Sequence, residues 1–347
     1  MKKNKDKSMI RVEDNHYKRF MRPNLFSKEF LFNHLSDLEE FQSLDTNFLK
    51  EKFKEVCSYY SDTLKDLKES QLENNFLQPI FRILGHTFEV QTSKKSEEED
   101  EGTKSIDYAF FYSGEDKATF QTNDGQKNAV KYSSCSTICE TKKWGILDGY
   151  DTVRKHDNTC PIWQLKMSYL DSINPKEQKA TVPFGILTDG KSWRIYSYRA
   201  ETDKFLEINL EYIIVHNDFP AFKMFWFFFS GESFRGKSYL SIVESGSKKL
   251  QAEVSGELRK QVYLSLEFIA TGIFRVYNLG KKRDWEEFLK YPTLKRYFDE
   301  NELERIDLEN PAIERIVLDI IYSESLVYLF RVLFLLYADV WTKIQWL

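Results

Sequence analysis

Residues 184–198, FGILTDGKSWRIYSY, decide the fold class of this chain of 347 residues. Two runs of apolar, aromatic and β-branched residues, 184–188 and 192–198, stand on either side of Asp189-Gly190. An Asp-Gly pair between two such runs is a strong signal for a tight turn that joins antiparallel strands. The sequence therefore predicts a β-hairpin at this point.

Outward from the hairpin, the pattern alternates between strands and helices. Further strand-like runs occupy 105–112, 131–144 and 203–214. Apolar spacing predicts helices over 26–67, 68–84 and 161–172, and over most of the chain from Pro220. The second of these contains Pro79 and is expected to end at a cap formed by Gly85, and the third is expected to start at Pro161. Two polar segments are predicted loops, 93–104 and 113–129, the second with a hairpin signal at Asp124-Gly125. We expect an α/β (α+β) fold in which helices flank a mixed central sheet, followed by an all-α region.

The change from a mixed to a helical pattern sets the expected domain boundaries. Residues 1–67 are predicted to form an N-terminal helical extension with a loose start over 1–24, 68–215 an α/β domain, and 216–347 a helical domain. Two segments of the last region are strongly apolar, 222–229 and 326–340. Both fall below the ~20 residues that cross a bilayer, so we interpret them as buried helices and expect no membrane partner.

Charge and cysteine content narrow the class of protein. Hydrophobic residues make up 41% of the chain, which is typical of a packed protein. The net charge of −4 gives no global basic surface, although a local basic groove for DNA remains compatible with it. The four cysteines lack a zinc-site spacing, and the N-terminus lacks the apolar core of a signal peptide. We therefore expect a reducing, cytoplasmic location.

Three residues on two predicted strands suggest chemistry. Glu140 and Lys142 are two positions apart, so both side chains point to one face of a strand. If the strand with Asp107 pairs with it, Asp107 and Glu140 converge on one ion. Carboxylate ligands of this kind suit Mg²⁺, with Mn²⁺ as a substitute. Such an ion polarises a phosphate and helps to deprotonate a water, while Lys142 orients that water or stabilises negative charge.

Glu73 is a further candidate ligand. On the predicted helix it shares the apolar face with Leu77, Ile80 and Leu84. A carboxylate on a buried face is costly unless it is paired or binds a metal. The alternative interpretation is a glutamate near a helix start, where the dipole stabilises it.

A plainer interpretation of the three residues is also open. Asp107 is then an ordinary acid, and Glu140 and Lys142 an exposed ion pair. The two carboxylates are 33 positions apart (140 − 107), so their pairing requires residues 113–130 to bulge out between the strands.

Several short segments in order resemble a known family. They are LENNFLQPIFRILGH (72–86), IDYAFF (106–111), CETKKW (139–144), WQLKMSYL (163–170) and FGILTDGKSWRIY (184–196), followed by the apolar helices after residue 220. Together, over about 70–340, they resemble the N-terminal nuclease region and helical connector of type IIG restriction-modification enzymes, within the PD-(D/E)xK nuclease superfamily. The resemblance implies a restriction-endonuclease-like fold, an Mg²⁺-dependent endonuclease acting on double-stranded DNA, metal ligation by Asp107 and Glu140, and a catalytic Lys142.

The resemblance extends to supporting residues. Glu73 matches the glutamate of the preceding helix, and Gln164 and Tyr169 resemble a glutamine-and-tyrosine helix signature that supports the site or contacts DNA. Five positions apart on a regular helix, these two point in different directions. Basic residues near these motifs are candidate DNA contacts, namely Lys143, Lys166, Lys191 and Arg194.

The chain departs from the family pattern in its methyltransferase motifs. Neither the glycine motif that binds S-adenosylmethionine nor an Asn-Pro-Pro-Tyr motif is present, and Asn310-Pro311 is followed by Ala312. This favours a truncated or split product, with a separate methyltransferase or specificity polypeptide as partner. The alternative function is a catalytically incomplete DNA-binding or assembly subunit of such a system.

Overall fold

The computed structural model describes residues 16–93, 105–149, 160–174, 180–235, 238–276 and 311–345. The chain divides into two compact units, Met1–Gln251 and Ala252–Leu347, which we call unit 1 and unit 2. Unit 1 holds a sheet between helices, and the described part of unit 2 is helical.

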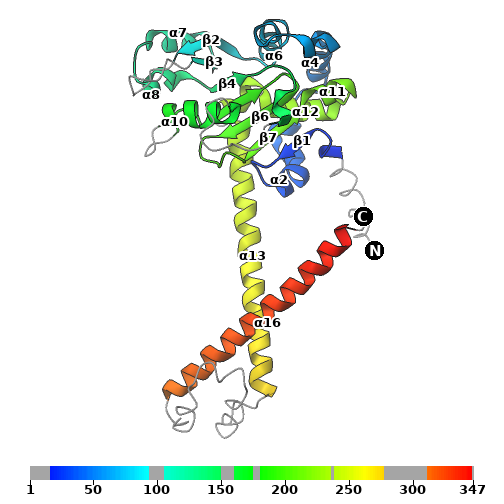
Figure 1. Cartoon of the computed structure of the whole chain (residues 1–347), viewed down its shortest axis with the longest axis vertical. Helices are drawn as coiled ribbons and strands as arrows, with labels where there is room; N and C mark the ends of the chain where they lie inside the picture. Colours follow the sequence, from blue (N-terminus) through cyan, green and yellow to red (C-terminus); the bar gives the residue numbers. More distant parts are fainter. Residues whose placement is uncertain are drawn as a thin grey trace. The chain divides into compact units, whose positions relative to one another are not determined.

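Unit 1 is built around a seven-stranded sheet with the order β1-β7-β6-β5-β4-β3-β2 (Figure 1). Within it β4 and β5 are parallel, and each other neighbouring pair is antiparallel. The mixed sheet confirms the predicted α+β class. The strands are β1 (Met21–Pro23), β2 (Thr87–Ser93), β3 (Ser105–Phe111), β4 (Thr137–Thr141), β5 (Phe184–Thr188), β6 (Ser192–Ser197) and β7 (Phe205–Asn209).

Helices cover both faces of the sheet and form two separate cores. The first core joins one sheet face to α2 (Lys28–Asn33), α4 (Thr46–Tyr59), the helix α5–η3–α6 (Glu69–Leu72, Glu73–Leu77, Gln78–Ile83), α11 (Leu210–Val215) and α12 (Phe219–Phe229). The second core joins the other face to α7 (Gly114–Thr122), η4 (Tyr132–Ser134), η5 (Ile146–Gly149) and the helix α9–η6–α10 (Pro161–Trp163, Gln164–Leu170, Asp171–Ile173). We call these the α6 layer and the η6 layer.

The predicted hairpin is confirmed. β5 and β6 pair in antiparallel register from Phe184 opposite Ser197 to Thr188 opposite Trp193. Gly190 has φ +83°, a conformation that glycine adopts without steric cost. Strands are also present where predicted at 105–112, 131–144 and 203–214, although each is shorter than its sequence pattern.

The predicted loop over 113–129 is wrong. Residues 114–122 form α7, capped by the Ser113 hydroxyl, which accepts a hydrogen bond from Asp116 N, and α8 follows over Asn128–Lys131. Gly125 has φ +84°, so the Asp124-Gly125 pair does make a turn, but between helices rather than strands. This helical excursion is the bulge that the long separation of β3 and β4 requires. Of the other predicted loop, 93–104, all but its first residue lies outside the described residues.

The N-terminal part of the chain is not a separate helical extension. β1 adds an edge strand to β7, with Met21 opposite Ile208, inside the stretch predicted to be loose. Three side chains accept N-cap hydrogen bonds, those of Ser27, Asp45 and Ser61. These caps split the predicted 26–67 helix into α2, α4 and short turns that include η1 (Leu35–Asp37), α3 (Glu39–Gln42) and η2 (Asp62–Asp66), because each starts a new helix.

The predicted helix over 68–84 is present and contains a π-helical turn. Gly85 ends it with φ +82°, which confirms the predicted cap. The π turn η3 lies directly before Pro79 in the first turn of α6. A proline inside a regular helix clashes with the carbonyl four residues before it, and a widened turn relieves that clash.

The predicted boundary at residue 215 is wrong, because α12 belongs to the core of unit 1. Phe222, Phe225 and Phe229 are fully buried there. The carbonyl of Phe229 lies 2.8 Å from His86 Nε2, and Gly231 N donates to Leu84 O at 2.9 Å. The unit boundary instead falls at 251/252, inside a long helix.

That long helix is α13 (Tyr239–Val276), and α16 (Pro311–Gln345) follows in unit 2. Residues 277–310, part of the region predicted to be helical, lie outside the described residues. Neither helix, nor any other in the described ranges, is both long and apolar enough to span a membrane.

Candidate functional site

Asp107 and Glu140 lie on the adjacent strands β3 and β4. The observed register of β3 and β4 pairs Tyr108 with Cys139, and one further step places Asp107 opposite Glu140. Along β4, Ile138 packs in the η6 layer and Cys139 in the α6 layer, so alternation turns Glu140 toward the η6 layer and Thr141 toward the α6 layer. The two carboxylates are close enough for the charge of Asp107 to raise the pKa of Glu140, and their convergence on one ion stays a prediction.

Thr141 links the two strands to the α6 layer. Its backbone N–H donates to Asp107 Oδ2 at 2.8 Å. Its hydroxyl oxygen lies 2.6 Å from Glu73 Oε1 and 3.0 Å from Asp107 Oδ2, so its single proton serves one of them at a time. Glu73, which is 9% exposed, is therefore brought to the end of β4 from the opposite face of the sheet.

Glu69 joins the cluster and was missed in the sequence. Carboxylate oxygens of Glu69, Glu73 and Asp107 lie within 4.8 Å of one another. Glu69 is one helical turn before Glu73, so the Glu-x-x-x-Glu spacing of 69 and 73 was the available signal. Such close like charges repel unless protons or a cation neutralise them.

Lys142 approaches the cluster through Glu140. Its Nζ donates to Glu140 Oε1 at 2.5 Å, while its backbone N–H donates to Thr188 O at 2.9 Å. Lys142 thus stands one residue beyond β4 but keeps the predicted side-by-side pairing. The other oxygen, Glu140 Oε2, is buried and has no donor at hydrogen-bonding distance among the described residues.

The electrostatics of Glu140 are those of a buried acid among other acids. Its side chain is 2% exposed. Burial, and then the negative charge of Asp107, raise the pKa of Glu140 to about 8, and the positive charge of Lys142 opposes that rise. The surrounding carboxylates raise the pKa of Lys142 against the effect of its burial, so its ammonium group stays charged. Three carboxylates, those of Glu140, Asp107 and Glu69, therefore act on one ammonium group.

The loop that follows Lys142 is held by the predicted hairpin. The Trp144 ring packs so tightly on Gly190 that a Cβ there would lie 2.9 Å from it. Asp189, fully buried, accepts hydrogen bonds from Leu147 N and Ser192 N, both at 2.8 Å. The hairpin turn therefore fixes the conformation of residues 142–147.

Replacing Glu140 with glutamine is expected to stabilise the metal-free chain in a pH-dependent way. The folded-state pKa of about 8 lies above the ordinary glutamate value of 4.5, so the folded chain holds this proton more tightly than the unfolded chain. Wild-type stability therefore falls as the pH rises through the window between these values, and glutamine avoids that loss. Thermal melts in EDTA are expected to agree near pH 5 and to favour Glu140→Gln at pH 8, by about 2–4 °C for each kcal/mol. Equal melting temperatures across the window would contradict the raised pKa.

Gln164 and Tyr169 are brought to the same side of their helix, contrary to the expectation from their spacing. They are the first and sixth residues of the π-helical turn η6. Residues five apart lie above one another where the hydrogen bonds run from i to i+5. Burial, then the charges of Glu140 and Asp107, raise the pKa of Tyr169, and a hydrogen bond with Glu140 contributes. Gln164 Oε1 is buried without a partner among the described residues.

Two of the four basic residues predicted to contact DNA are structural instead. Lys166 is 3% exposed and its Nζ donates to Ser197 O and Ala200 O, both at 2.5 Å. Arg194 is fully buried, with its Nε 2.5 Å from Glu207 Oε2. Neither can reach a phosphate, so these predictions are wrong. Residue type alone does not distinguish a surface cation from one that caps buried carbonyl or carboxylate groups.

The other candidate DNA contacts differ in accessibility. Lys143 is exposed and follows directly after Lys142. Lys191 is half-buried and its Nζ lies 2.5 Å from Asp148 Oδ2, so that carboxylate neutralises it. Tyr169 is 4% exposed and faces Glu140 rather than solvent.

No family model, curated protein or solved structure matches this chain.

Proposed function

We propose that unit 1 is a divalent-metal-dependent endonuclease that hydrolyses DNA phosphodiester bonds. The proposed fold is restriction-endonuclease-like, of the PD-(D/E)xK kind, and the proposed role is in a type IIG-like restriction-modification system. One observation carries the proposal: Glu73, Asp107, Glu140 and Lys142 converge at the end of β4 from two layers and two strands. These are the residues that the resemblance names. The plainer interpretation, an exposed ion pair beside an ordinary acid, does not account for a buried Glu140.

The donor set fits a hard divalent cation. It consists of carboxylate oxygens, which Mg²⁺ and Mn²⁺ prefer. Glu140 Oε2 is a buried acceptor without a donor among the described residues. The carboxylates of Glu69, Glu73 and Asp107 form a cluster of their own, with oxygens within 4.8 Å of one another. Asp107 and Glu140 would hold the ion, with Glu73 next to them. When bound, such an ion would polarise the scissile phosphate and lower the pKa of a water.

The chain's own residues supply the rest of the chemistry. The Lys142 ammonium, fixed by Glu140, is placed to orient the attacking water and to stabilise the negative charge that develops on the phosphate. Thr141 fixes the Asp107 carboxylate through its backbone N–H. Because both contacts exist before substrate arrives, the site is preorganised.

Double-stranded DNA is the proposed substrate, and its binding is expected to require a bound divalent cation. Without a bound ion the site presents several carboxylates to a polyanion, which repels it. Lys143 is the exposed basic residue nearest in sequence to the site and is placed to contact a backbone phosphate. Base recognition is assigned to another polypeptide, a methyltransferase or specificity subunit.

The purified chain is expected to nick supercoiled plasmid in Mg²⁺ or Mn²⁺ and to be inactive in EDTA. Ca²⁺ should support DNA binding with little cleavage, because it is larger and less strict in its coordination geometry. Product ends should carry a phosphate and a hydroxyl, as hydrolysis requires. DNA binding without cleavage in both Mg²⁺ and Mn²⁺ would contradict the proposal.

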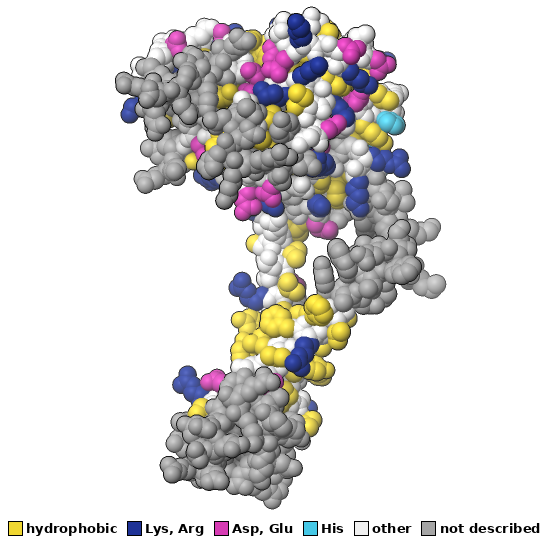
Figure 2. All heavy atoms as spheres, viewed as in Figure 1, with side chains coloured by type: hydrophobic (Ala, Val, Ile, Leu, Met, Phe, Trp, Pro, Cys, Tyr) yellow, Lys and Arg dark blue, Asp and Glu magenta, His cyan; other side chains and the backbone are white. Residues whose placement is uncertain are grey.

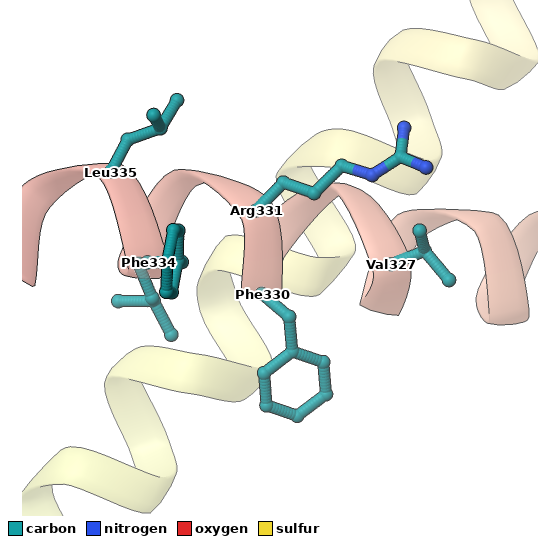
Figure 3. Close-up of a pocket in the computed structure, with 6 residues that line it drawn as sticks. Val327, Phe330, Arg331, Phe334 and Leu335 are labelled. Atoms are coloured by element: carbon teal, nitrogen blue, oxygen red, sulfur yellow. The ribbon is translucent and has the colours of Figure 1, made fainter. Parts of the chain in front are cut away.

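Unit 2 favours a second candidate function, that of an assembly subunit. Large apolar side chains are exposed on its helices, including Phe268 at 82%, Phe330 at 65% and Phe334 at 70%. Hydrophobic side chains gather over these helices in Figure 2, and Figure 3 shows Phe330 and Phe334 among the side chains that line a hollow on α16. Exposed apolar surface of this kind marks interaction sites. Binding without cleavage would leave this as the better account.

A further inference from the structure

The helix α16 has apolar side chains on two sides, and those of one side are exposed. Side chains spaced four residues apart are buried on the first side, namely those of Val317, Ile321, Ser325 and Leu329. On the roughly opposite side, the side chains of Val327, Phe330 and Phe334 are 43%, 65% and 70% exposed. Because exposed apolar surface of this extent is costly in water, this second side is suited to bind a partner.

The residues of the exposed side have the spacing that two packed helices require. Ser323, Val327, Phe330 and Phe334 follow one another at steps of four, three and four residues. We call these four residues the α16 seam. Steps that alternate between three and four keep one stripe of a helix against a second helix along its length. Three of the four side chains also line one hollow on α16 (Figure 3). The partner that fits the seam is therefore another helix.

Two charged residues flank the seam in equivalent positions. Glu324 follows Ser323 directly, and Arg331 follows Phe330 seven residues later. The residues three and four positions before and after each of them are Ile, Val, Tyr, Phe or Leu, so neither forms an ion pair along the helix. Charges beside the seam of a helix pair select the partner and its orientation. A partner for this seam therefore presents a carboxylate to Arg331 and a basic group to Glu324.

We propose that the α16 seam binds a second copy of this chain, with the two α16 helices antiparallel and related by a twofold axis. A twofold interface uses the same surface of both copies, so that surface must be complementary to itself. With the axis midway between positions 327 and 330, Val327 of each copy lies opposite Phe330 of the other. Ser323 then lies opposite Phe334 in the same way. Each layer pairs a large side chain with a smaller one, which allows close packing. The inference does not depend on nuclease activity.

The same arrangement pairs the flanking charges. Arg331 of each copy lies about 3 Å along the helix axis from the level of Glu324 in the other copy, on the same side of the seam. Two ion pairs form in this way. Parallel helices would instead place Phe330 against Phe330 and bring Arg331 beside Leu326 and Leu333. The charges thus favour an antiparallel pair of identical helices.

The full chain is expected to form a reversible dimer with a Kd of about 1–10 µM in sedimentation equilibrium, the weak end of the range for protein interfaces. Phe330→Asp should raise that Kd by more than about 100-fold, because it buries a carboxylate in the seam. The matched control is Phe268→Asp on α13, where the phenylalanine is 82% exposed and lies outside the seam, and its Kd should equal that of wild type. Circular dichroism should show the same helix content for the three proteins.

Two results would overturn the pairing of copies. A chain that stays monomeric at about tenfold above this concentration range would leave the seam to a different polypeptide. A dimer that Phe330→Asp weakens no more than Phe268→Asp does would place the contact elsewhere on the chain.

Reversal of the flanking charges tests the antiparallel orientation. Arg331→Glu and Glu324→Arg are each expected to raise the dimer Kd by about 3- to 30-fold, because two ion pairs become two contacts between like charges. The double variant should return to the wild-type Kd, since opposite charges meet again with their places exchanged. Arg315→Glu, at an exposed position of α16 that does not flank the seam, is the control and should change nothing. A double variant that dimerises as weakly as the single variants would contradict the proposal.

Discussion

Replacing Asp107 with asparagine is expected to reduce plasmid nicking about 10³-fold, which corresponds to about 4 kcal/mol of transition-state stabilisation. Asparagine keeps the shape of the side chain and an oxygen that can accept from Thr141 N, so the contact between β3 and β4 can survive. It removes the negative charge that the ion requires. Because the local structure is kept, the loss should appear in the rate and not in the melting temperature.

The matched control for Asp107→Asn is Glu55→Gln. Glu55 is exposed on α4, where it pairs with Lys52, so the substitution removes one carboxylate that is not part of the cluster. Initial rates of nicking in Mg²⁺ are compared for the three proteins at equal concentration. A substantial residual rate for Asp107→Asn, close to that of Glu55→Gln, would remove Asp107 from the site.

Lys142→Met is the second substitution with a large expected effect, a loss of nicking of about 10²–10³-fold, as for removal of a preorganised charged donor. Methionine keeps much of the aliphatic length and removes the ammonium group that pairs with Glu140 Oε1 at 2.5 Å. Lys142 is not a metal ligand, so Mn²⁺ binding should persist. It should even strengthen, because a neighbouring positive charge has been removed.

This prediction is tested by measuring the nicking rate and the Mn²⁺ affinity of Lys142→Met separately. A variant that binds Mn²⁺ as well as wild type but does not cut assigns Lys142 to the chemical step. Lys54→Met on α4 is the control, since that lysine is exposed and no ion pair among the described residues links it to the site. Parallel loss of Mn²⁺ binding and nicking in Lys142→Met would instead make Lys142 a structural partner of Glu140.

The pairing of Glu140 with Lys142 could be predicted because side chains two positions apart on a strand point to one face. The strand with Asp107 also pairs with the strand of Glu140, as expected. The hairpin at 184–198 was equally clear, since Asp189-Gly190 requires a turn and glycine provides the positive φ.

The predictions that were wrong concern residues whose environment is set by tertiary packing. Lys166 and Arg194 resembled surface cations, yet each satisfies buried oxygen atoms that become neighbours only in the folded sheet. The segment 113–129 resembled a loop because polar residues cover the exposed side of α7. Local composition carries no information about such long-range contacts.

The two π-helical turns could not be predicted from the periodicity of the sequence. The spacing of Gln164 and Tyr169 was judged at 3.6 residues per turn, and the extra residue in η6 changes that result. Glu69 was missed for a different reason. Its Glu-x-x-x-Glu relation to Glu73 was visible, but a pair of acids on a helix is common without any ligand.

Direct titration with Mn²⁺ tests the central claim, that Asp107 and Glu140 hold the ion that makes this site a nuclease. Wild-type chain, Asp107→Asn and Glu55→Gln are titrated by calorimetry in the absence of DNA. The predicted result is saturable binding by wild type and Glu55→Gln, with binding lost in Asp107→Asn although its melting temperature in EDTA is unchanged. Equal Mn²⁺ binding by wild type and Asp107→Asn, or no binding by wild type, would contradict the account.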